Sequence, residues 1–179
     1  LFINPDRADG QFKFPQAVLV KGARESVGHL ELVQKSKTTE VKGSGLLWLV
    51  AQSFGIGDSA DFYHVYAKFD KDLKKHRKYG QVAFYKDFVN LTTGQDVLQK
   101  AMDNLYMWFP NGIKYYVPHK DKTVDVDTLT WACTIFKTAY MTRKIDDPTT
   151  LVTLLDFFKV DYSRLVNNHR PPTFPLQEE

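Results

Sequence analysis

The most informative polar residues of this chain are lysines that could bind an anionic partner. They are interleaved with aromatic side chains between Phe62 and Phe88. If a helix begins near Ser59, the 3.6-residue period places an apolar face at Phe62, Val65, Tyr66, Phe69 and Leu73. The opposite arc, called the lysine ridge below, consists of Lys68, Lys71, Lys74, Lys75 and Lys78. Ammonium groups that face one way can displace condensed counterions from a phosphate backbone, so the ridge predicts binding of a polyanion. Any soluble amphipathic helix has a similar polar face, and that plainer interpretation is the more frequent one.

Further basic and aromatic residues extend this candidate interface. Arg77 and Tyr79 follow within the same stretch. A second segment, expected to be a strand and a loop, contributes Lys114, Tyr116, Lys120 and Lys122. Lysines would hold phosphates while aromatic faces stack on the bases of a single strand. A half-exposed strand followed by a solvated loop explains the second segment equally well.

A nucleotide-binding turn is the alternative chemistry. Gly55, Gly57 and Ala60 form a G-x-G-x-x-A pattern after the apolar run 46–51, and a possible strand from Gln81 to Tyr85 ends near Asp87. This order suits a βαβ unit whose backbone amides meet a pyrophosphate. Asp58 would put a negative charge inside the phosphate loop, and the acidic residue comes about ten residues too late for the pattern. Ordinary glycine turns are therefore the favoured interpretation.

Other catalytic and metal-binding motifs are missing from the sequence. There is no GxSxG elbow, HExxH pair, Walker A loop or EF-hand loop, and no two of the five histidines are spaced i,i+4. Cys133 lies between Trp131 and Phe136, where a buried and inert thiol is expected. No catalytic residue, cofactor or metal ligand is predicted.

Length and composition predict one globular domain over residues 1–168, followed by an extended C-terminal arm over 169–179. The 179 residues suffice for a substantial core, and 43% hydrophobic with 25% charged residues is ordinary for a globular protein. The arm contains Pro171, Pro172 and Pro175, which exclude a helix. The single cysteine excludes an intramolecular disulfide and fits a reducing compartment. No apolar run approaches the roughly 20 residues of a membrane span, so an intracellular protein, in the cytoplasm or a virion, is expected without membrane insertion.

The expected fold class is α+β and mainly helical, with a short N-terminal β-hairpin followed by a bundle of about five helices. The hairpin is predicted to pair 16–21 with 27–34 across a turn at Gly22. The run 46–51 fits a buried strand or a buried helix, and periodicity does not separate them.

Helix boundaries are predicted more sharply after Asn90. Thr93 with Asp96 marks a helix start, and the helix should end before Pro110. A short strand is expected over 113–117, a long helix opening at Asp125 or Asp127, a helix capped by Asp147 with Pro148, and a last short helix over 162–166.

These observations favour a nucleic-acid-binding structural protein that self-assembles, such as a viral nucleocapsid or coat subunit that binds single-stranded RNA. Its partners would be the nucleic acid and further copies of the chain, which the C-terminal arm would contact through Phe174 and Leu176. The alternatives are a small nucleotide-dependent enzyme that uses the Gly55 turn and a protein-interaction module whose abundant aromatic residues form an interface.

Overall fold

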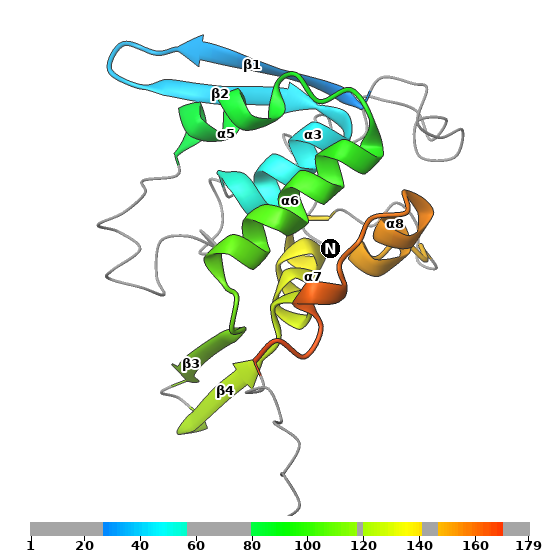
Figure 1. Cartoon of the computed structure of the whole chain (residues 1–179). Helices are drawn as coiled ribbons and strands as arrows, with labels where there is room; N and C mark the ends of the chain where they lie inside the picture. Colours follow the sequence, from blue (N-terminus) through cyan, green and yellow to red (C-terminus); the bar gives the residue numbers. More distant parts are fainter. Residues whose placement is uncertain (1–26, 57–79, 118–119, 141–146, 170–179) are drawn as a thin grey trace, which may run out of the picture.

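The computed structural model describes residues 27–56, 80–117, 120–140 and 147–169. This part of the chain contains five α-helices and two small antiparallel sheets, so the fold belongs broadly to the α+β class as predicted. The elements in chain order are β1 (Gly28–Gln34), β2 (Thr39–Ser44), α3 (Gly45–Val50), the π-helix η1 (Ala51–Gly55), α5 (Gln81–Phe88), α6 (Gly94–Trp108), β3 (Ile113–Val117), β4 (Lys122–Val126), α7 (Thr128–Ala139), α8 (Leu151–Phe157) and the 3₁₀-helix η3 (Ser163–Leu165). Figure 1 shows β1 and β2 at one end of the molecule and β3 and β4 at the other, with the helices between them.

The first sheet is a hairpin in which one strand was predicted and the other was not: β1 matches the strand expected over 27–34, but its partner is different. β1 pairs with β2 in a register that sets Leu32 opposite Val41, whereas the sequence suggested residues 16–21 as the partner. The turn is closed by two backbone hydrogen bonds between Lys35 and Thr38 and by the Thr39 hydroxyl, which donates to Gln34 Oε1 at 2.8 Å. Ser36 is the only residue of this turn of a type that commonly marks turns; Gly, Pro, Asn and Asp are absent from residues 35–38. Residues 16–21 lie outside the described segments.

Helix α5 covers the outer edge of β2. The Val41 N–H donates to Gln81 Oε1 at 2.5 Å, so the side chain of the first residue of α5 pairs an edge amide that would otherwise face solvent. The strand considered at 81–85 is wrong, because these residues belong to this helix. Its stacked rings, Phe84 and Phe88, are both buried and lie 4.2 Å apart between centroids.

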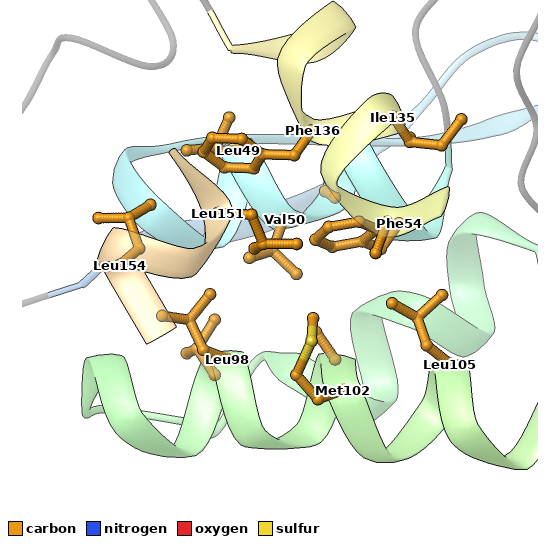
Figure 2. Packing of buried hydrophobic residues seen from close by; sticks show 14 of the residues in the cluster. Leu49, Val50, Phe54, Leu98, Met102, Leu105, Ile135, Phe136, Leu151 and Leu154 are labelled. Atoms are coloured by element: carbon orange, nitrogen blue, oxygen red, sulfur yellow. The ribbon is translucent and has the colours of Figure 1, made fainter. Parts of the chain in front are cut away.

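The core forms around the apolar run that the sequence left undecided between strand and helix. The run is helical, as α3 continued by η1, and nearly all its residues are buried. Figure 2 shows Val50 of this run and Phe54 of η1 between side chains of α6 such as Met102 and side chains of α7 and α8 such as Phe136 and Leu151. Because neighbours cover the run on several sides, it has no polar face, and its sequence shows no 3.6-residue period.

Two predicted helix starts are confirmed. The Asp96 N–H donates to Thr93 Oγ1 at 3.1 Å at the start of α6, and the Thr130 N–H donates to Asp127 Oδ1 at 2.7 Å at the start of α7. Each side chain pairs one amide that the first helical turn leaves without an internal acceptor.

The start of α8 differs from its prediction. Thr150 caps this helix in a reciprocal capping box with Thr153, instead of Asp147 followed by Pro148. The Asp147 carboxylate is engaged elsewhere: it accepts the Tyr140 hydroxyl at 2.9 Å and the Thr149 N–H at 3.0 Å. The predicted last helix is a single 3₁₀ turn, η3.

No helix in the described segments is long and apolar enough to cross a bilayer.

Candidate nucleic-acid interface

The predicted interface is only partly within the described residues. Seven of its members lie in the stretch 57–79, outside them, and remain predictions: Lys68, Lys71, Lys74, Lys75, Arg77, Lys78 and Tyr79. The other four, Lys114, Tyr116, Lys120 and Lys122, lie on the β3–β4 hairpin or in its connection. The geometry of the candidate site is therefore that of this hairpin.

The hairpin forms because two short segments rich in β-branched and aromatic residues face each other. β3 was predicted, but β4 was interpreted as a solvated loop, because three of its five residues are polar and it is too short to show a clear alternation. Asp121, in the connection, has a φ of 44°, in the left-handed region that Asp tolerates better than most residues. Ile113 is buried at the base, which anchors the hairpin in the core.

Strand alternation divides the predicted contacts between two faces. Lys114 lies opposite Asp125 and Tyr116 opposite Thr123, so Lys114 and Tyr116 share one face. Lys122 lies opposite Val117 and belongs to the other face. Lys120 lies in the connection, where it is exposed. The structure thus brings Lys114 and Tyr116 together and separates Lys122 from them.

The shared face combines an exposed ring with an ion pair. Tyr116 is 56% exposed, and its hydroxyl donates to Asp121 Oδ1 at 2.6 Å. That hydrogen bond, with a smaller effect of burial, raises the pKa of Tyr116, so the phenol stays neutral. Lys114 Nζ lies 3.9 Å from Asp125 Oδ2 with both side chains largely exposed, so water screens this pair and Lys114 remains available to an anion.

The nucleotide-binding turn is contradicted at the residue that the structure describes. Gly55 lies in the π-helix η1, which follows a helix instead of a strand, and the ring of Phe84 packs directly against it. Gly57 and Ala60 lie outside the described residues. A phosphate loop needs a glycine whose backbone is open to a ligand, and Gly55 is buried under an aromatic ring.

The cysteine thiol and the possible metal ligands show no sign of a reactive site in the described segments. The Cys133 thiol, which was expected to be buried, is only partly buried. This partial burial, with a smaller contribution from the Asp127 charge, raises the pKa of the thiol, so less of it is the reactive thiolate at neutral pH. In the segments that the structure describes, no three His, Cys, Asp or Glu side chains lie close enough together to hold a metal ion.

Comparison with known proteins gives no relative: no protein-family model, no curated protein and no solved structure matches this chain.

Proposed function

We propose that this chain is a structural protein that binds single-stranded nucleic acid, most readily RNA, and assembles with further copies of itself. In this proposal it acts as a nucleocapsid or coat-like subunit in the cytoplasm or a virion. The observation that carries the proposal is the Tyr116 ring, which is exposed on a hairpin with three exposed lysines and is held by Asp121.

A held and exposed ring suits base stacking. An aromatic side chain fixed at its hydroxyl loses less rotamer freedom when a base stacks on it than a free side chain does. Stacking of a base on such a ring contributes about 1–3 kcal/mol and tolerates any base, which fits a protein that covers nucleic acid without reading its sequence.

The hairpin alone is a weak electrostatic site. Over residues 113–126 the sequence has three lysines and two aspartates, a net formal charge of +1. Phosphate binding scales with the number of charges that the protein neutralises. In our proposal the hairpin therefore supplies the stacking platform, and the lysine ridge at 68–78 supplies most of the phosphate contacts.

Two substitutions of Tyr116 test the stacking role. Tyr116→Ala should weaken the binding of a labelled oligouridylate about 5- to 150-fold, since it removes the ring. Tyr116→Phe keeps the ring and loses only the bond to Asp121, so it should bind much closer to the native protein. Fluorescence anisotropy gives the affinities.

Phe157→Ala is the matched control, because Phe157 is a comparably exposed aromatic residue on α8. It should leave the affinity unchanged. Equal affinities of Tyr116→Ala and the native protein would remove the hairpin from the interface, whereas no binding by the native protein would favour a protein-interaction role.

A further inference from the structure

Three consecutive residues near the C-terminus, Asn167–His169, contact both ends of the β3–β4 hairpin. We call them the C-terminal clasp. They lie about 40 residues beyond the β4–α7 junction in sequence and about 60 beyond the end of α6. Figure 1 shows the segment after η3 passing the point where β4 meets α7.

Asn168 makes the central contacts of the clasp. Its Nδ2 donates to the carbonyl oxygen of Phe109 and to Thr128 Oγ1, each at 3.0 Å, and its Oδ1 accepts the Thr128 N–H at 3.0 Å. Phe109 ends α6 just before β3, and Thr128 begins α7 just after β4. One carboxamide thus ties together the two chain segments from which the hairpin extends.

Asn167 adds a backbone contact. Its N–H donates to Asp127 Oδ2 at 3.0 Å, while the other oxygen of the same carboxylate caps α7. Asn167 has a φ of 55°, a left-handed conformation that few residues other than Gly, Asn and Asp adopt readily. A backbone held in this region is evidence that its surroundings determine the conformation.

His169 packs against the turn into β3. Gly112, with a φ of 70°, has no room for a Cβ, because such an atom would lie 2.5 Å from His169 Cβ and 2.6 Å from the Val126 carbonyl oxygen. The clasp therefore packs on the base of the hairpin as well as hydrogen-bonding to it.

We propose that the C-terminal clasp is a positioning device that fixes the orientation of the β3–β4 hairpin and thereby controls the affinity of its Tyr116 face. Without the clasp, Ile113 would still anchor the base of the hairpin and the Thr128 hydroxyl would still donate to the Phe109 carbonyl oxygen at 2.7 Å, but the hydrogen bonds of Asn168 to both chain segments would be lost. The part of the proposal that concerns affinity rests on the proposed function. The part that concerns orientation does not.

Hydrogen exchange of the full chain, followed by mass spectrometry, tests the orientation. In Asn168→Ala the amides of β3 and β4 should exchange about tenfold faster, since the N–H of the buried Thr128 loses its acceptor and the Phe109 carbonyl oxygen loses one of its donors. The amides of α6 should be unchanged. Asn167→Gly is the matched control, because glycine keeps both the N–H donor and the left-handed φ, and it should behave as the native protein.

If the alanine variant folds poorly, the same hydrogen-exchange measurement can be made on Asn168→Asp. Its carboxylate can still accept the Thr128 N–H but cannot donate to the Phe109 carbonyl oxygen, so exchange in the hairpin should again accelerate. Native rates in the hairpin of both Asn168 variants, or one uniform acceleration across hairpin and helices, would overturn the proposal.

Binding of a labelled oligouridylate separates the two proposals. If the clasp controls affinity, Asn168→Ala should bind severalfold more weakly than Asn167→Gly. If the native protein binds no oligonucleotide, the proposed function fails, and the exchange rates alone decide whether the clasp positions the hairpin. If the native protein binds and both variants bind equally, control of affinity by the clasp is refuted.

Discussion

Gly55 and Phe84 lie in such close contact that a methyl group on residue 55 would overlap the aromatic ring. The missing side chain of Gly55 therefore makes room for a ring that packs the π-helix η1 against α5. This contact explains the glycine by packing, where the sequence also allowed a phosphate-binding turn.

Gly55→Ala should destabilise the protein by about 1–3 kcal/mol, because the added methyl group overpacks the core and Phe84 must move. Gly80→Ala is the matched control, since a Cβ there would meet nothing within 4 Å. Urea denaturation measures both, and the control, which changes only the N-cap of α5, should cost less than about 1 kcal/mol. Equal stabilities of the two variants would contradict the close contact.

Asp127 should make stability depend on pH in acid. Burial raises the pKa of its carboxyl. The hydrogen bonds from Thr130 and Asn167, together with the positive charge of His169, lower this pKa by more than burial raises it, so the net shift is downward. A depressed pKa contributes stability above the unfolded value of about 4, and this contribution disappears as the pH falls through the folded pKa.

Asp127→Asn should therefore cost stability at pH 6 and little in strong acid. Thermal unfolding of both proteins at several values between about pH 6 and pH 3 checks this, since the range brackets the unfolded carboxyl pKa. The gap in melting temperature should narrow as the pH falls. A constant gap over the whole range would show that the carboxylate charge does not matter.

Two neighbouring residues of η3, Arg164 and Leu165, should differ sharply in how much they contribute to stability. Leu165 is 1% exposed, so Leu165→Ala should cost about 2–5 kcal/mol through lost burial and a cavity. Arg164 pairs with Asp103 Oδ1 at 2.5 Å and lies 4.7 Å from the centre of the Tyr106 ring, but both charged side chains are about half exposed. Arg164→Ala should cost only about 1 kcal/mol or less. A larger loss for Arg164→Ala than for Leu165→Ala in urea denaturation would reverse this assignment.

Local signals in the sequence predicted what local contacts determine. Thr93 was identified as a cap, and Asp127 as one of two candidates with Asp125, because a helix cap engages an amide two or three residues away. Thr150 was missed because Asp147 followed by Pro148 is the stronger sequence pattern, and the sequence does not reveal that Tyr140 and Thr149 already occupy the Asp147 carboxylate. Strand pairing also escaped prediction, since the choice of β2 as the partner of β1 depends on a polar turn and on the cover that α5 provides.

The sequence identified which types of residue the candidate site contains, but only part of how they are arranged in space. Lys114 and Tyr116 share a face because they are two residues apart in β3, which the sequence predicted. The placement of Lys122 on the other face depends on β4, which the sequence did not predict. Asn168 gave no signal, because its partners Phe109 and Thr128 are far away in the sequence.

Binding of a labelled oligouridylate across a range of salt concentrations tests the central claim most directly. If the lysine ridge holds phosphates, the logarithm of the affinity should fall linearly with the logarithm of the salt concentration. Glutamine at Lys71, Lys74, Lys75 and Lys78 should reduce the slope by up to about 3, or about 0.7 for each lysine. Glutamine at four lysines outside the ridge, the exposed Lys37, Lys42, Lys86 and Lys137, makes the same change in net charge and should leave the slope near its native value. Equal slopes for the two quadruple variants, or no binding by the native protein even at low salt, would contradict the account.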